Sequence, residues 1–342
     1  SLNIEKLQFN SLIFKYSLFS DFLNSVMVIK DNYNEKNKEF NTQLYIPSTE
    51  AASIVDVGNC CFINCQSRAD SEEGGAISIG ITYTNLKISK TLFSGCSSTT
   101  IGGAIFTVGI GFIITSSEFS DCTSSDSGGA IFSNNYKRPS SGYQTLLNQS
   151  IVINTICNYL PLDLNASSMI SLNCNFTNNK NNYQSDPSDP KQYCFGFPLI
   201  TTGDDYKFYY ANYVSNDGDC VMELNSKSQS KIGYVNVIDN KNLNFFFFDD
   251  PEGPQSEYLY EGNFLRLTNF AFFGNTVSPK STTILFGNNF IDIVPYKLEN
   301  CWFEYSQATV NSMLNGHLIT GGQFDMQTAT YTQEHLFTRP NF

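Results

Sequence analysis

Two short motifs occur three times in the same order between residues 54 and 132. The first motif places Phe three residues before Cys, in Cys61-Phe-Ile-Asn-Cys65, Leu92-Phe-Ser-Gly-Cys96 and Glu118-Phe-Ser-Asp-Cys122. The second motif is Gly-Gly-Ala-Ile, at 74–77, 102–105 and 128–131. The phenylalanines are 31 and then 26 residues apart, and the Gly-Gly pairs are 28 and then 26 residues apart. Motifs that recur at such a period indicate a repeat architecture.

The composition of the units decides which repeat architecture this is. They are rich in Gly, Ser, Thr and β-branched residues and lack a 3.6-residue apolar period, which excludes helical solenoids. The Leu-x-x-Leu-x-Leu frame of leucine-rich repeats is absent. Short strands joined by Gly- and Ser-rich corners predict an all-β fold, a right-handed parallel β-helix of the pectin-lyase type.

Each motif has an expected place in one coil of such a helix. We expect the phenylalanines to point inward and to stack at about 4.8 Å along the axis. The alanines of the second motif should form another buried column, and Gly-Gly should allow positive φ and close approach of neighbouring coils. The expected columns are Phe62, Phe93 and Phe119, and Ala76, Ala104 and Ala130.

Weaker copies of the first motif continue beyond residue 132, for example Phe176-Thr-Asn-Asn179 and Phe272-Phe-Gly-Asn275. We therefore expect one β-helix over residues 51–322. Long polar or Pro-containing stretches predict loop insertions near residues 134–150, 180–193 and 249–262. Residues 1–50 are predicted to hold an N-terminal cap and the first irregular coil or coils, and residues 323–342 a C-terminal tail or cap.

The first 30 residues allow two interpretations. Apolar residues such as Leu12, Tyr16, Phe19 and Leu23 approximate a helical stripe, and a capping helix would protect the open strand edge of a solenoid. The same Phe, Tyr, Val and Ile residues also suit strands, so a degenerate first coil is the alternative.

The pairing of Phe-x-x-Asn with Gly-Gly-Ala-Ile resembles the polymorphic membrane protein repeat, known from chlamydial surface adhesins and from surface proteins of some protists. Gly-Gly-Ala-Ile is intact three times here, whereas Cys replaces Asn in the three strict copies. The resemblance implies a right-handed β-helix displayed outside the cell. A C-terminal series of alternating strands typical of the bacterial proteins is absent, so the resemblance points to a secreted relative of the protist type.

Charge and apolar content limit the classes of partner. The chain has 20 basic and 32 acidic residues, a net charge of −12, and its Lys and Arg are scattered along the sequence. Nucleic acid is therefore not an expected partner. No apolar run approaches the roughly 20 residues that cross a bilayer, so we expect no transmembrane segment.

Cysteines and sequons favour the secretory pathway, with a signal peptide already removed before Ser1. The glycosylation candidates are Asn148, Asn165 and Asn175, and alternation with an inward Phe176 predicts that Asn175 faces outward. Cys65, Cys96 and Cys122 should form a ladder at one corner, either with one bridged pair or as buried thiols. Further disulfide or ladder candidates are Cys60, Cys61, Cys174 and Cys194.

Residues with catalytic or ligand-binding patterns are scarce. The pairs Asp204-Asp205 and Asp249-Asp250 lie beside Gly or Pro, where solvated turns are the ordinary explanation. His317 has no acidic neighbour, and His335 lies in the C-terminal tail. Asp217 and Asp219 offer oxygens for calcium but lack the later Glu of a full loop. No catalytic residue, cofactor site or zinc site is assigned.

Two functional classes follow, with a third behind them. A rigid solenoid with variable loops suits a non-enzymatic extracellular or cell-surface interaction protein, such as an adhesin or surface-coat component. Its partner would be a protein or glycan at a cell surface, or copies of itself. The alternatives are a structural subunit of an extracellular filament or matrix, and a polysaccharide lyase or hydrolase.

Overall fold

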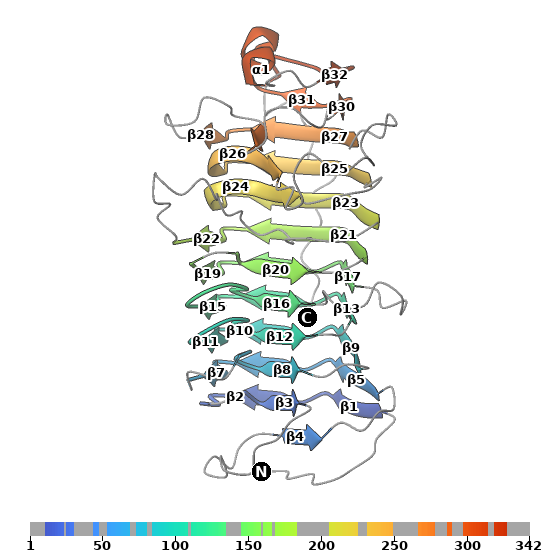
Figure 1. Ribbon diagram of the computed structural model, residues 1–342, viewed down its shortest axis with the longest axis vertical. Helices are drawn as coiled ribbons and strands as arrows, with labels where there is room; N and C mark the ends of the chain where they lie inside the picture. The colour runs from blue at the N-terminus through green and yellow to red at the C-terminus, as the bar shows by residue number, and fades with distance from the viewer. Residues whose placement is uncertain are drawn as a thin grey trace, which may run out of the picture.

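The computed structural model describes residues 11–23, 25–30, 44–47, 53–68, 73–80, 84–108, 111–134, 145–158, 160–165, 168–182, 205–224, 231–248, 266–277, 286–288, 297–313 and 318–326. Within these residues the chain is a stack of coils whose strands lie one above another (Figure 1). The described strands form three sheets, called here sheet A (17 strands), sheet B (6 strands) and sheet C (9 strands). Neighbouring strands within each sheet pair in parallel. The fold is a parallel β-helix, as the repeat predicts.

One coil shows how the motifs build the fold. Strands β5 (Ser53–Gly58) and β6 (Cys61–Ile63) lie in sheet A, β7 (Gln66–Ser67) in sheet C and β8 (Ile77–Gly80) in sheet B. The next coil repeats this path with β9 (Thr84–Ser89), β10 (Leu92–Ser94), β11 (Ser97–Ser98) and β12 (Ile105–Val108). The register places Phe62 beside Phe93, so each motif lies over its own copy.

The described strands of the following coils keep these three sheets. Sheet A continues with β13 (Gly111–Thr115), β14 (Glu118–Ser120), β17 (Thr145–Asn148), β18 (Ile151–Ile153), β21 (Ser168–Thr177), β23 (Asp205–Val214), β25 (Lys231–Ile238), β27 (Arg266–Phe273), β30 (Lys297–Glu299), β31 (Trp302–Phe303) and β32 (Leu318–Thr320). Sheet C continues with β15 (Thr123–Ser124), β19 (Ile156–Cys157), β22 (Lys180–Asn181), β24 (Asp217–Leu224), β26 (Lys241–Phe248), β28 (Thr276–Val277) and β29 (Phe286–Asn288). Sheet B continues with β16 (Ile131–Asn134) and β20 (Leu162–Asn165).

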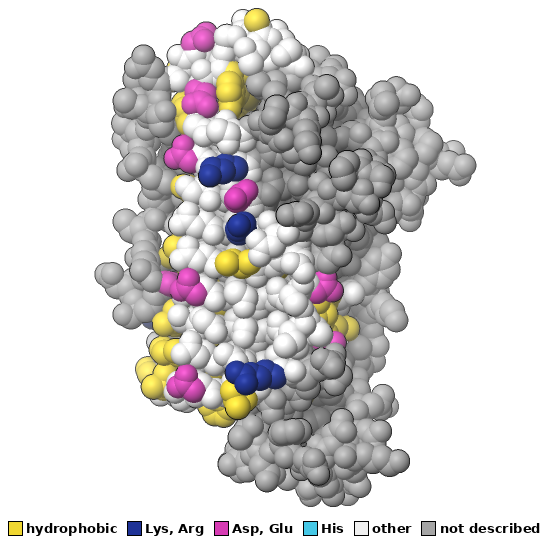
Figure 2. Space-filling view, turned by 90° about the vertical axis from the view of Figure 1, so that its left-hand side faces the viewer, with side chains coloured by type: hydrophobic (Ala, Val, Ile, Leu, Met, Phe, Trp, Pro, Cys, Tyr) yellow, Lys and Arg dark blue, Asp and Glu magenta, His cyan; other side chains and the backbone are white. Residues whose placement is uncertain are grey.

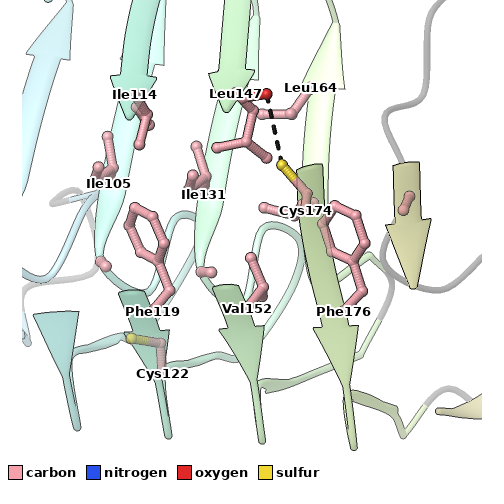
Figure 3. Close-up of a cluster of buried hydrophobic side chains, with 14 of the residues drawn as sticks. Ile105, Ile114, Phe119, Cys122, Ile131, Leu147, Val152, Leu164, Cys174 and Phe176 are labelled. Carbon is pink, nitrogen blue, oxygen red and sulfur yellow. Dashed lines mark hydrogen bonds between the residues drawn. The ribbon is translucent and has the colours of Figure 1, made fainter. Parts of the chain in front are cut away.

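A column of aromatic rings runs through the interior behind sheet A. Phe62 and Phe93 stack at a centroid distance of 4.9 Å, and Phe93 and Phe119 stack at 4.8 Å with only 1° between the rings. The column begins at Phe19 and, with valine at two positions, reaches the far end of the molecule through Phe119, Val152, Phe176, Tyr213, Val237, Phe272, Phe303 and Phe324. Figure 3 shows part of it between Phe119 and Phe176.

The Gly-Gly corners have the two properties that their sequence predicts. The first glycine of each pair has positive φ, 76° at Gly74, 70° at Gly102 and 68° at Gly128. The second glycine packs against the next coil, since a Cβ on Gly103 would lie 2.0 Å from the carbonyl oxygen of Gly129. Ala76, Ala104 and Ala130 follow and are fully buried.

The first described coil consists of strands and not of a helix. Strands β1 (Ser11–Lys15), β2 (Leu18–Ser20) and β3 (Met27–Lys30) pair with β5, β6 and β8, and β4 (Leu44–Pro47) extends sheet B. The capping-helix interpretation is therefore wrong for residues 11–30. A bend at Tyr16, whose φ is 53°, interrupts the apolar stripe that suggested a helix.

A short helix lies at the opposite end. Helix α1 (Gln307–Met313) lies at the top of Figure 1 and carries Val310 into the core. Phe324 stacks on Phe303 at a centroid distance of 5.6 Å. Most of the three predicted insertions falls outside the described residues, in 135–144, 183–204 and 249–265. Residues 145–150, at the end of the first predicted insertion, belong to sheet A and its bend.

Candidate functional site

Between Phe62 and Phe272, the corner three residues after the aromatic column carries first cysteine, then Thr155 and then asparagine. Cys65, Cys96 and Cys122 occupy it in the first coils, and Asn179, Asn216, Asn240 and Asn275 occupy it in later ones. Every one of these side chains is buried, at an exposed fraction of 6% or less. The corner is therefore an internal ladder along the axis of the solenoid.

The asparagines bond both to each other and to the backbone. Asn216 Oδ1 accepts hydrogen bonds from the backbone N–H and from Nδ2 of Asn179, at 3.0 and 3.1 Å. Asn216 Nδ2 donates to the carbonyl oxygen of Phe176 at 3.0 Å. Asn240 repeats this pattern with Asn216 and Tyr213, and Asn275 repeats it with Asn240 and Val237.

The cysteines make the equivalent donor bond to the preceding coil. The thiol of Cys96 donates to the carbonyl oxygen of Phe62. The thiols of Cys65 and Cys122 point in the same way to the carbonyls of Phe19 and Phe93. Cysteine can replace asparagine at this corner because both side chains donate a hydrogen bond to a backbone carbonyl of the preceding coil.

The cysteines whose side chains are described are free thiols, namely Cys60, Cys61, Cys65, Cys96, Cys122, Cys157, Cys174 and Cys301. Hydrogen bonding and burial raise the pKa of Cys65 and Cys96, while burial raises the pKa of Cys174 to about 11 and that of Cys301 to about 12. Thiols in this state behave as small hydrophobes and not as nucleophiles. Cys194 lies outside the described residues.

A carboxylate pair that the sequence does not reveal lies at the edge of sheet B. Asp163 sits between the inward-facing Leu162 and Leu164, and Ser127 Oγ donates a hydrogen bond of 2.6 Å to its Oδ2. Burial and, to a smaller extent, the nearby charge of Asp126 raise the pKa of Asp163 to about 6, against the lowering effect of the Ser127 hydrogen bond. Burial also raises the pKa of Asp126. A carboxyl group that titrates near neutral pH can exchange protons with a ligand.

The exposed faces carry aromatic and charged residues in columns. Tyr210 and Tyr234 stack at a centroid distance of 5.0 Å and are 39% and 40% exposed. On sheet C, the exposed Lys180, Asp217 and Lys241 alternate in sign on successive rungs. Figure 2, which views this side, shows charges of both signs on a surface that is otherwise mostly polar.

The remaining sequence candidates are dispersed. Asn175 lies on the outer face of β21, partly exposed, and its Oδ1 accepts a hydrogen bond of 2.7 Å from Asn212 Nδ2. Asn148 is also partly exposed, whereas the side chain of Asn165 is not among those described. Asp217 is exposed at the start of β24. The structure brings no group of three His, Cys, Asp or Glu side chains together in the described residues.

Outside the described residues lie the carboxyl group of Asp219, both histidines, Asp204 and the Asp249-Asp250 pair, and the side chain of Asp205. Among the described helices, none is long and apolar enough to cross a membrane. Comparisons of the chain with family models, with curated proteins and with solved structures find no match.

Proposed function

We propose that this protein is a secreted or cell-surface interaction protein, an adhesin or surface-coat component that presents a rigid surface and turns over no substrate. One observation carries the proposal: the aromatic column and the corner ladder run side by side through the described coils. Such ladders fix each coil on the next, so outward residues from distant parts of the sequence are held in straight columns. The resemblance to the polymorphic membrane protein repeat supports the same role.

The filament alternative would need the two ends of the solenoid to pair. At the C-terminal end, helix α1 buries Val310 against the core and Phe324 covers Phe303. These contacts occupy part of the surface that a stacked copy would use. End-to-end growth through that end is therefore the less favoured alternative.

The enzyme alternative has one specific observation in its favour. The Asp163 carboxyl group, with its pKa near 6, has the acidity that a general acid requires near neutral pH. Its hydrogen bond to Ser127 and its place between two inward leucines are equally consistent with a structural role.

The test compares binding, turnover and assembly on the full 342-residue chain. We expect saturable binding to extracellular proteins or glycans immobilised on a sensor surface, with no release of cleaved product from pectin, polygalacturonate or glycosaminoglycans, with or without calcium. Reproducible cleavage that disappears in Asp163→Asn would replace the proposal with the enzyme. Ordered fibres in electron micrographs would replace it with the structural subunit.

A further inference from the structure

An aliphatic patch on sheet A surrounds one of the three sequons. Its members lie on three successive rungs, are all partly exposed, and are Ile113 of β13, Leu146 of β17, and Ile170 and Leu172 of β21. Asn148, the acceptor of the sequon Asn148-Gln149-Ser150, lies two residues after Leu146 on the middle rung. The register places Asn148 directly opposite Leu172. The sequon and the aliphatic patch therefore share one surface.

Strand alternation assigns this surface to the outside of the solenoid. Ile114, Leu147 and Ser171 adjoin the patch along the three strands, and each is buried with an exposed fraction of 1% or less. Since successive residues of a strand point to opposite faces of a sheet, Asn148 and the members of the patch point outward. Neighbouring rungs are about 4.8 Å apart, so a group attached to Asn148 begins within one rung of Leu172.

The side-chain amide of Asn148 leaves free the atom that a glycan needs. Its Oδ1 accepts a hydrogen bond of 3.4 Å from Asn173 Nδ2. Its Nδ2, the nitrogen to which N-linked sugars are attached, donates no hydrogen bond to any described residue. Substitution at Nδ2 would keep the bond from Asn173, because that bond uses only the oxygen.

The amide of Asn175, in another sequon, is engaged differently. Its Oδ1 accepts a hydrogen bond from Asn212 Nδ2, and Asn212 Oδ1 accepts one from Asn236 Nδ2, both at 2.7 Å. Asn212 and Asn236 are only 2% and 3% exposed. A glycan on Asn175 would therefore be attached at the end of a buried row of amides, whereas Asn148 adjoins apolar side chains that a sugar can cover.

We propose that Asn148 carries an N-linked glycan whose first sugar covers the aliphatic patch, and that Asn175 is unmodified. In this reaction Nδ2 of Asn148 forms a bond to C1 of N-acetylglucosamine, the C1–O bond to a polyprenyl diphosphate donor breaks, and Nδ2 gives up one proton. The apolar face of the sugar would then pack on Leu146 and Leu172 and remove their exposed surface from water. The inference rests on the proposed function, because a chain meets such a donor in the secretory pathway.

The first measurement is the occupancy of each sequon in the full chain, secreted from a eukaryotic host behind a supplied signal peptide. Peptide mass mapping before and after treatment with peptide-N-glycosidase should find Asn148 glycosylated and Asn175 unmodified. Asn148→Gln should remove the glycan at this position. Asn175→Gln is the matched control, and it should leave the glycan pattern unchanged.

The second measurement tests whether the first sugar covers the patch. Endoglycosidase H leaves one N-acetylglucosamine on an oligomannose glycoprotein, whereas peptide-N-glycosidase removes the whole glycan. The single-sugar form should melt at a higher temperature, and bind less of a fluorescent apolar dye, than the glycan-free form or Asn148→Gln. Leu172→Ser should reduce this difference in melting temperature. Val108→Ser, at an exposed apolar position of sheet B, should leave the difference unchanged.

The outcomes separate this inference from the proposed function. A secreted chain with Asn148 unmodified, or with Asn175 glycosylated in its place, would reject the assignment and leave the secreted interaction protein standing. Equal melting temperatures for the single-sugar and glycan-free forms would reject the packing on the patch. Failure of the unglycosylated chain from bacteria to bind any extracellular protein or glycan would instead reject the proposed function, since that assay does not involve a sugar on Asn148.

Discussion

The side-chain oxygen of Asn216 accepts two hydrogen bonds from Asn179, one from its backbone N–H and one from its amide Nδ2. Asn216 is bonded in turn to Asn240 on the next coil, through both its backbone N–H and its Nδ2. Each asparagine therefore satisfies a backbone donor that the bend would otherwise leave buried without a partner. The side-chain amide of each asparagine thus satisfies the backbone of the bend and at the same time joins its coil to the neighbouring coil.

Replacing one member of this ladder should cost more than one hydrogen bond. Asn240→Ala removes the acceptor of the buried Asn216 N–H and the donor to the Tyr213 carbonyl, so we expect a loss of about 3 kcal/mol in the free energy of unfolding. Asn240→Cys should lose less, because cysteine makes the equivalent donor bond to the preceding coil elsewhere in the ladder. Urea denaturation measures both, with Asn182→Ala at an exposed position as control, where a change within about 0.5 kcal/mol is expected. Equal losses in the alanine and cysteine variants would contradict the equivalence.

Truncating a ring of the aromatic column should leave a cavity and lower the free energy of unfolding. Phe93→Ala removes a ring that is stacked on both sides and fully buried, and should destabilise the chain by about 3–5 kcal/mol. Phe132→Ala is the matched control, since Phe132 lies on the outer face of sheet B and is only partly buried. Its loss, measured in the same denaturation experiment, should be the smaller one. A larger loss at Phe132 would argue against the column as the main source of stability.

The thiols should be protected from alkylation in the folded state. Burial and raised pKa values keep Cys96, Cys174 and Cys301 protonated at pH 8, so iodoacetamide should leave them unmodified until the chain unfolds. Cys61, which is partly exposed on the outer face, should react first. Peptide mass mapping with and without denaturant gives the order of reaction. Bridged cysteines in the non-reduced digest would show that the ladder is oxidised and not thiol.

The free energy of unfolding should decrease as the pH rises through the pKa of the Asp163 carboxyl group. The pKa of Asp163 is about 6 in the folded chain, above the ordinary value of 3.8, so the folded state holds its proton over a range in which the unfolded chain has released it. This contribution is complete below about pH 4 and is lost as pH rises through 6. Asp163→Asn cannot ionise, so its melting temperature should exceed that of the unsubstituted protein at pH 8. The two should converge near pH 4, and a gap that does not change with pH would contradict the assignment.

The repeat was readable from the sequence because its motifs are local. Phe93 and Gly102 fall within one short segment, and the same two residues recur 26 positions later, at Phe119 and Gly128. Inward alternation and the positive φ of glycine follow directly from such a pattern. The sequence also shows that cysteine, as at Cys96, stands where later copies have asparagine. The structure explains this substitution, because both side chains donate to a backbone carbonyl of the preceding coil.

The shared register of Lys207, Lys231, Arg266 and Lys297 on sheet A could not be found from their spacing, because that spacing varies. These four residues nevertheless stand six positions before Tyr213, Val237, Phe272 and Phe303, the residues of the aromatic column on the same coils. Counting back from that column would have found them. No comparable signal marks Asp163, since its raised pKa depends first on burial and then on Ser127 and Asp126, which lie in the preceding coil.

The N-terminal coil shows the opposite error. Apolar residues at helical spacing also satisfy two short strands when a bend lies between them, and the left-handed backbone of Tyr16 provides that bend. Leu12, Phe14 and Phe19 then pack against the core while Ile13 and Leu18 face outward. The spacing of apolar residues does not reveal such a bend, because tyrosine rarely adopts the positive φ that the bend requires.

The closed corner has a consequence for how such a chain can change in length. The segment from Phe93 to Glu118 contains one complete turn of the solenoid and ends where its successor begins, in register. Because its ladder residues bond only to the coils on either side, duplicating or deleting that segment in the gene would move one half of the molecule along the axis without disturbing a contact elsewhere. The length of the solenoid can therefore change in steps, by about 4.8 Å for each inserted unit.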